Sequence, residues 1–297
     1  MKMLRSVNGG NVDGYSGETM TLRTLFTLLL LLAGLGTASG QAASGNEIRF
    51  GSVAMDTPAV MHHRLTPLTE YLTKELGQPV VLKLSVDMKE AINAVAKGDV
   101  ELAYLTPVAY LRSHVQGNSQ LVVKTVTQGK GTFQLMVVVR DDSPIHDIEA
   151  LMGKTFAFGD PAALLQRAVV VGAGMPLAKL GKQDFIGHYD NIARAVMRGF
   201  YDAGILKDTT AVKWRGQGLR IIHTSPQLPP YNITASAKVS QSLLAKMRQA
   251  FLKLDASNPQ HRSVIKALDD EYDGFAATND AEYDIVRELT VPFEMNR

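Results

Sequence analysis

The sequence of 297 residues contains no cysteine. This excludes a disulfide framework, a thiol nucleophile and a zinc site built on thiolates, and it leaves no thiol to carry a lipid. The formal net charge is only +2, and no run of basic residues points to nucleic acid. With 45% hydrophobic and 20% charged residues, the chain has the composition of a folded globular protein long enough for two lobes.

Long apolar segments are also scarce. The one at residues 25–35 is shorter than the roughly 20 residues that a membrane-spanning helix needs. Arg23 precedes it and small residues follow at 38–43, which is the pattern of a secretory signal peptide. We therefore expect residues 1–43 to be an N-terminal extension and a cleaved signal, with export to the periplasm. Met1 and Met20 are both candidate starts, and an uncleaved membrane anchor is the alternative.

Catalytic motifs are missing as well. The sequence has no Gly-x-Ser-x-Gly elbow, no phosphate-binding loop and no metal-ligand spacing. His62 and His63 are adjacent, so they cannot share one face of a helix to hold a metal ion. These absences predict a binding protein without a cofactor or metal rather than an enzyme.

What the chain does contain is a unit that it repeats. Residues 94–105 and 195–206 each combine the end of a helix, a basic residue with Gly, an acid and a short apolar strand. Such units are common in α/β proteins. Two of them at corresponding places nevertheless predict two lobes of similar build, with a ligand-binding cleft between them.

Strand and helix patterns alternate along the chain, which predicts an α/β fold with mainly parallel sheets. The middle segment, 140–225, reads as an insertion into the first lobe. We therefore expect a first lobe from 46–139 and 226–297, a second lobe from 140–225, and a two-strand hinge near Val139 and Ser225. The chain after the Pro-rich segment 224–232 reads as helical.

Ligands of such sheets bind at the carboxyl ends of the strands. Strand-like segments end before Asp56, Thr106, Asp160 and His188. Pro161 should begin a helix whose free N–H groups could bind an anion, and the alternative is an ordinary turn in which Asp160 caps the helix.

Several of these segments together resemble a known family. The string Phe-Gly-Asp-Pro at 158–161, the stretch 187–204, and Ser-Pro-x-Leu-Pro at 225–229 occur in this order, and 98–107 agrees in the first lobe. This arrangement resembles the phosphate, phosphite and phosphonate-binding proteins of ABC transporters over residues 47–270. The resemblance implies the type II periplasmic-binding fold, with two lobes.

The resemblance also implies a set of ligand-binding residues, with departures from the family pattern. Ala163, Leu164 and Leu165 stand where the family has Ser-Thr-Ser, and Tyr189, after His188, stands where it has His. Loss of these hydroxyls predicts weak binding of phosphonates and phosphate. Asp202 matches an acid that can face a ligand amine, and Tyr104 matches a cleft position; the alternatives are a solvated acid and a core tyrosine. The candidate ligand-binding residues are Asp56, Thr57, Tyr104, Thr106, Asp160, Ala163, Leu164, Leu165, His188, Tyr189 and Asp202.

The resulting hypothesis is an exported solute-binding protein of an ABC-type uptake system. We expect a monomer that binds a small anionic ligand, phosphonate-like or an organic acid, and docks on an inner-membrane ABC permease. The first alternative is a sensory module of the same fold, acting in trans on a receptor or kinase. The second is an enzyme on this fold, for which Tyr189, His188 and Asp202 are the candidate reactive groups.

Overall fold

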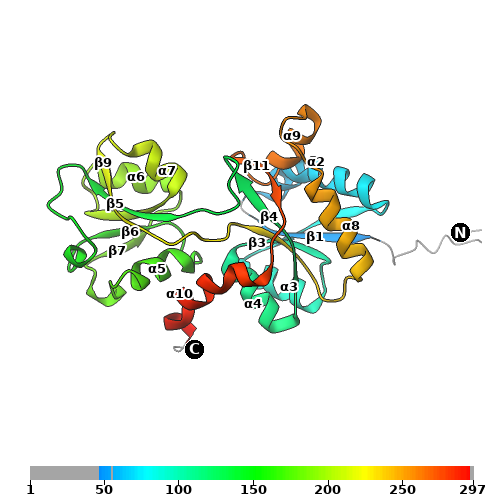
Figure 1. Cartoon of the computed structure of the whole chain (residues 1–297), viewed down its shortest axis with the longest axis horizontal. Helices are drawn as coiled ribbons and strands as arrows, with labels where there is room; N and C mark the ends of the chain where they lie inside the picture. Colours follow the sequence, from blue (N-terminus) through cyan, green and yellow to red (C-terminus); the bar gives the residue numbers. More distant parts are fainter. Residues whose placement is uncertain (1–46, 55, 295–297) are drawn as a thin grey trace, which may run out of the picture. The chain divides into compact units, whose positions relative to one another are not determined.

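The computed structural model describes residues 47–54 and 56–294, and these form two α/β lobes (Figure 1). The predicted signal segment lies outside the described residues. None of the described helices is both long enough and apolar enough to cross a membrane.

The first lobe is built on a sheet of six strands in the order β11-β4-β10-β3-β1-β2. Its helices cover both faces: α3 and α4 pack on one side, and α2, α8 and α9 on the other (Figure 1). The strands are β1 (Ile48–Val53), β2 (Val80–Ser85), β3 (Leu102–Leu105), β4 (Gln120–Thr127), β10 (Asn232–Ala235) and β11 (Tyr272–Ala276), and the helices are α2 (Pro58–Leu76), α3 (Met88–Lys97), α4 (Pro107–Gly117), α8 (Gln241–Leu252) and α9 (Pro259–Lys266).

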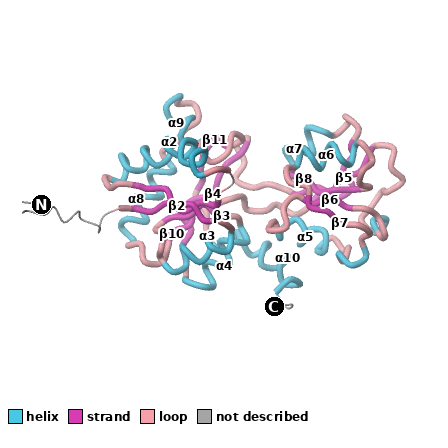
Figure 2. The backbone as a smooth tube through the Cα atoms, turned by 180° about the vertical axis from the view of Figure 1, so that it is seen from behind, coloured by secondary structure: helices cyan, strands magenta, loops and turns pink. Residues whose placement is uncertain are grey.

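The second lobe is built on a sheet of five strands in the order β7-β6-β8-β5-β9. Helix α5 covers one face, and α6 and α7 cover the other (Figure 2). The strands are β5 (Leu135–Arg140), β6 (Phe156–Phe158), β7 (Gln183–Phe185), β8 (Ala203–Lys207) and β9 (Leu219–Thr224), and the helices are α5 (Leu164–Gly172), α6 (Tyr189–Met197) and α7 (Asp208–Trp214).

The repeated unit occupies corresponding places in the two lobes. Helix α3 leads through Gly98 into β3, and α6 leads through Gly199 into β8. Both glycines have a positive φ, of 76° and 75°, a conformation that side chains other than Gly adopt at a cost. Each unit ends in a buried strand that pairs in parallel with a neighbour, β3 with β1 and β8 with β6.

The two-lobed α/β fold is thus confirmed, but three details differ from expectation. Each sheet is mixed rather than mainly parallel, because β10 runs antiparallel to β3 and β5 runs antiparallel to β8. Strand β5 lies inside the second sheet, so residues 135–139 belong to the second lobe rather than the first. The C-terminal part is not all helical, since β11 pairs with β4 at the edge of the first sheet.

The chain passes between the sheets twice, after β4 and after β9. These two segments pair with each other: Phe133 and Leu228 exchange backbone hydrogen bonds of 3.0 and 2.8 Å. Both residues belong to one apolar cluster with the core of the second lobe, and Leu228 is fully buried. The crossing is therefore a paired two-stranded connection of the predicted kind, but its first segment lies at Phe133 rather than near Val139, which is inside β5.

The last helix, α10 (Asp284–Glu294), follows a short 3-10 turn (Asp280–Tyr283). Although it comes after β11 of the first lobe, it packs against α5 of the second lobe and against α4 of the first. Val286 of this helix is fully buried in the apolar cluster that contains α5. The C-terminal helix therefore contacts both lobes.

Candidate functional site

In the first lobe, three tyrosines gather near the carboxyl end of β3. The hydroxyls of Tyr104 and Tyr272 are 2.5 Å apart, and the ring of Tyr231 stacks on Tyr104 with centroids 5.0 Å apart. Tyr104 is buried, whereas Tyr231 is 38% exposed. Tyr231 therefore covers Tyr104 and leaves part of its own surface exposed at this edge of the sheet.

In the second lobe, a buried amide organises the end of β6. The Gln166 side chain accepts a hydrogen bond from the backbone N–H of Gly159 at 2.8 Å and donates to the Tyr189 hydroxyl at 3.3 Å. A Cβ atom at Gly159 would lie 2.9 Å from Gln166 Nε2 and 3.0 Å from the Gly187 carbonyl oxygen. Glycine is thus required here for close approach, and Gln166 ties the turn after β6 to the first turn of α6.

The turn between β6 and α5 differs from the expected anion site. Helix α5 begins at Leu164 rather than at Pro161. The N–H of Ala162 donates to the Asp160 carboxylate at 2.6 Å, that of Ala163 to the Asp160 carbonyl at 2.9 Å, and that of Leu164 to the Ala162 carbonyl at 2.8 Å. These three N–H groups are engaged within the turn, so they are not free to bind an anion in this conformation.

One ion pair joins the strand ends of the two lobes. Lys207, the last residue of β8, places its Nζ 2.7 Å from Oε2 of Glu271, which precedes β11. The Lys207 side chain is 19% exposed and that of Glu271 is 48% exposed. Beside them, Asp208 accepts hydrogen bonds from the N–H groups of Gln134 and Thr209. The pair brings the carboxyl end of β8 against the first lobe.

The tyrosines at these strand ends stay neutral over the physiological pH range. Burial raises the pKa of Tyr189. The hydrogen bond with Gln166 lowers it in part, and the charges of Asp208 and Glu271 raise it. Burial also raises the pKa of Tyr231, with smaller contributions from Tyr272 and Tyr189. The groups that raise its pKa therefore come from both lobes, Tyr272 from the first and Tyr189 from the second. A neutral tyrosine hydroxyl can donate and accept hydrogen bonds.

Some predicted residues lie at these strand ends. Asp160 and His188 are exposed there, and Tyr189 is half-buried. Thr106 caps α4 by accepting a hydrogen bond from the Ala109 N–H at 3.2 Å. The exposed residues Asp56 and Thr57 follow β1 and are joined by a hydrogen bond of 2.6 Å from the Thr57 N–H to the Asp56 carboxylate.

Other predicted residues do not join the site. Leu164 and Leu165 are each only 8% exposed, and Leu165 belongs to the apolar core of the second lobe, so their side chains have little surface to offer a ligand. Asp202 precedes β8, at the amino end of the strand, and its carboxylate accepts hydrogen bonds from the N–H and hydroxyl of Thr155. It stabilises the sheet at the opposite end from Lys207, which corrects the expectation that it faces a ligand.

Sequence reasoning missed Gln166, Lys207 and Tyr231. Lys207 directly follows a predicted apolar strand. Thr106 and Asp160 were chosen because they stand at such strand ends, and the same criterion applied to every predicted strand would have found Lys207. Tyr231 stands in the Pro-rich crossing segment, and Gln166 within a helix. Neither has a local pattern, because their importance depends on partners far away in the sequence.

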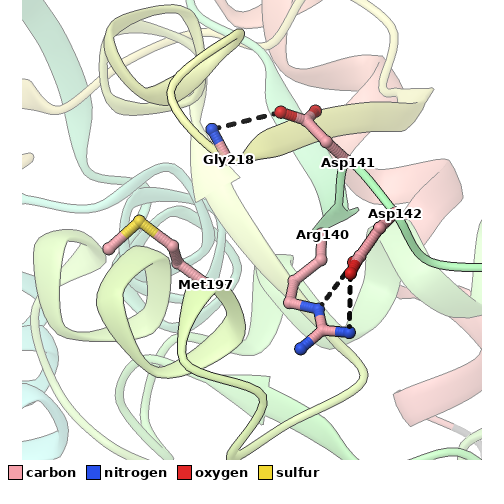
Figure 3. Close-up of a pocket in the computed structure, with 5 residues that line it drawn as sticks. All are labelled: Arg140, Asp141, Asp142, Met197 and Gly218. Carbon is pink, nitrogen blue, oxygen red and sulfur yellow. Dashed lines mark hydrogen bonds and ion pairs between the residues drawn. The ribbon is translucent and has the colours of Figure 1, made fainter.

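A cavity of about 250 Å³ lies elsewhere, at the opposite end of the second sheet (Figure 3). Arg140 and Asp142 form an ion pair at 2.8 Å there, and Asp141 accepts a hydrogen bond from the Gly218 N–H. Since Val139 pairs with Ala203, the first residue of β8, this cavity is at the amino end of that strand. The described residues contain no group of three or more His, Asp or Glu side chains that could hold a metal ion.

Comparisons with known proteins agree on the class of protein. The phosphate-import protein PhnD of Mycolicibacterium smegmatis is 24% identical over 253 residues, covering 75% of this chain and 78% of that one. XAC2383 from Xanthomonas citri, solved with a chloride ion, superposes with a TM-score of 0.70 at 20% identity, covering 84% of this chain and 98% of that one. PhnD1 from Prochlorococcus marinus, solved with methylphosphonate, has a TM-score of 0.66 at 17% identity and covers the same shares.

The two structural likenesses are below 25% identity, so they support the fold alone. A family model described as the periplasmic substrate-binding protein of phosphonate ABC transporters matches residues 50–283, most of the chain. The two-lobed fold is in keeping with that description. The chain therefore belongs to the family of periplasmic substrate-binding proteins of phosphonate ABC transporters.

Proposed function

We propose that this protein binds a small anionic ligand, phosphonate-like or an organic acid, where the strand ends of its two lobes meet around Tyr231 and Lys207. The observation that carries the proposal is the 2.7 Å contact of Lys207 with Glu271, because it joins the carboxyl end of β8 to the edge of the first sheet where β4 ends and β11 begins. Ligands of α/β sheets bind at such ends.

The names of similar proteins support an anion. The relative from M. smegmatis is named for phosphate, and the two similar structures were solved with chloride and with methylphosphonate. This chain lacks the hydroxyl groups of the expected Ser-Thr-Ser segment, so we propose that phosphate and 2-aminoethylphosphonate bind weakly. Tyr231 is partly exposed at this edge, which favours a ligand with an apolar part that would pack against the tyrosine.

The family membership makes this a transport protein rather than an enzyme. We further propose that its partner is an inner-membrane ABC permease, that the mature protein is a monomer, and that the N-terminal signal segment is removed on export. No observation favours the sensory alternative, and the match to a transporter family supports uptake.

Thermal unfolding of the mature protein with a panel of oxyanions, organic acids, amino acids and amines tests the ligand class. A ligand at about 100 times its Kd adds about 2.7 kcal/mol of stability, or roughly 5–10 °C in Tm for a protein of this size. We expect anions with an apolar part to give the largest shifts. Tyr231→Ala should abolish the shift, whereas Phe200→Ala, which changes an exposed aromatic at the far end of the second sheet, should keep it. Stabilisation by amines alone, or an unchanged shift in Tyr231→Ala, would refute the proposal.

A further inference from the structure

Lys207 has the position and the partial burial expected of an anion-binding residue. It ends β8 at the carboxyl edge of the second sheet, where Leu135 pairs with it. Its side chain is largely covered, so its charge is less screened by solvent than that of an exposed lysine. A partly buried ammonium needs an anionic partner, since leaving it unpaired costs free energy.

The partner that Lys207 has in this structure comes from the other lobe. Glu271 lies between the turn at Asp269 and the start of β11, and its backbone N–H donates to the Asp269 carboxylate at 2.8 Å. The Glu271 carboxylate also lies 3.5 Å from the Thr209 hydroxyl. Because the Glu271 side chain is about half exposed, water can solvate this carboxylate when it leaves Lys207.

The turn between β6 and α5, where the sequence predicts an anion site, offers few free donors. The N–H groups of Ala162, Ala163 and Leu164 donate within the turn before α5, and none of these three residues has a hydroxyl. An anionic ligand therefore finds few donors at this turn, and the ammonium of Lys207 is the charged donor at the neighbouring strand end.

We propose that Lys207 is the residue that recognises the anionic group of the ligand, and that the Glu271 carboxylate stands in for this group until the ligand displaces it. The inference rests on the proposed function and names the chemistry of its site: a carboxylate, sulfonate or phosphonate headgroup bound by an ammonium. The exchange is feasible because water solvates the released Glu271 carboxylate while the anionic group of the ligand takes its place on the same cation.

The rival explanation is a latch, in which the ion pair only holds the two lobes together in the closed form. The two explanations differ in what Glu271 does. If it competes with the ligand, removing its charge strengthens binding. If it is half of a latch, removing its charge weakens binding as much as removing the charge of Lys207.

Calorimetry with three anions, namely methylphosphonate, methanesulfonate and benzoate, and with tetramethylammonium as the cationic control, separates these cases. The variants are Lys207→Met, Lys207→Arg, Glu271→Gln and the exchange Lys207→Glu/Glu271→Lys. Lys182→Met is the matched control, because it removes an exposed lysine of the same lobe. Each variant is first melted without ligand to establish that it is folded.

We expect at least one anion to bind the wild type, and Lys207→Met to weaken it by about 10-fold to 100-fold, the range for a hydrogen bond to a charged group. Lys207→Arg should bind, since it keeps the charge, and Lys182→Met should match the wild type. Glu271→Gln should bind more tightly than the wild type, and unchanged binding would show that Glu271 does not compete with the ligand. The exchange should not restore binding.

Equal weakening by Glu271→Gln and Lys207→Met, with recovery in the exchange variant, would overturn the proposal in favour of the latch. Unchanged binding in Lys207→Met, or a wild type that binds none of the three anions, would also overturn it. The proposed function fails separately, if the wider panel contains no stabilising anion. A wild type that binds an anion through other residues leaves the proposed function intact and refutes only the role of Lys207.

Discussion

At the scale of single residues, Glu101 and Asp202 show why an acid recurs in the repeated unit. Glu101 accepts a hydrogen bond from the backbone N–H of Arg49 at 2.7 Å, and Asp202 accepts one from that of Thr155 at 2.8 Å. In return, the N–H of each acid donates to the carbonyl of the same neighbour, at 3.1 Å in both lobes. The acid thus joins two parallel strands at their amino ends, which explains its presence without a ligand.

The lowered pKa of Glu101 predicts how the stability of the protein depends on pH. Burial alone would raise its pKa, but the hydrogen bonds and charge of Arg49 outweigh this and lower the pKa below its usual range. The stabilisation is therefore present above the unfolded-state pKa of about 4.3 and is lost as the pH falls through the lower folded value. Glu101→Gln should lower Tm at neutral pH and flatten its fall between about pH 5 and 3. Thermal melts across this range check it, with exposed Glu70→Gln as the control; equal slopes in both variants would contradict it.

At the scale of elements, α10 is the segment whose position is least expected from its place in the chain. It follows β11 of the first lobe, yet it packs on α5 of the second. The ring of Tyr283, just before α10, lies 4.8 Å from that of Tyr110 in α4. Tyr283, just before α10, contacts the first lobe, and Val286 of α10 is buried in the core of the second lobe. The C-terminal segment therefore belongs to the cores of both lobes. The described chain should therefore unfold as one cooperative unit.

A matched pair of substitutions in α10 tests this role. Val286 is fully buried and Val291 is 48% exposed, and the two share the same helix and residue type. Val286→Ala should cost about 2 kcal/mol, or roughly 4–8 °C in Tm, because it removes buried methyl groups and leaves a cavity. Val291→Ala should change Tm little. Equal effects, or a second unfolding transition in Val286→Ala, would argue against a shared core.

How far the sequence predicts these elements depends on how local their determinants are. The repeated helix–Gly–strand units were predicted because a helix, its terminal Gly and the next strand lie within about a dozen residues. The apolar run of β5 reveals a buried strand, but burial alone does not say which sheet contains it. Strand β11 has Asp273 and Gly274 in its middle and depends on pairing with β4, over 140 residues away. The Lys207–Glu271 contact is similarly non-local, so no motif reveals it.

At the scale of the whole molecule, the two paired crossing segments are the natural hinge between the sheets. Domain closure in such proteins is absorbed by a few residues in the connections, while each lobe moves as a rigid body. Here the pairing of Phe133 with Leu228 keeps the crossings together, so rotation should occur in the residues on either side of this pair. Helix α10 contacts α5 and α4, and one of these contacts must adjust when the lobes move.

We therefore expect ligand-linked closure, measured by small-angle X-ray scattering on the mature protein. The radius of gyration should fall when the stabilising anion found by thermal unfolding is added at saturation, because the lobes approach each other around it. Tyr231→Ala, which should not bind the anion, should show no change at the same ligand concentration, and Phe200→Ala should close like the wild type. An unchanged radius in the saturated wild type would mean that the lobes do not move on binding. In that case the ion pair of Lys207 with Glu271 would hold the strand ends in a fixed arrangement. The ligand would then bind without rotation about the crossings.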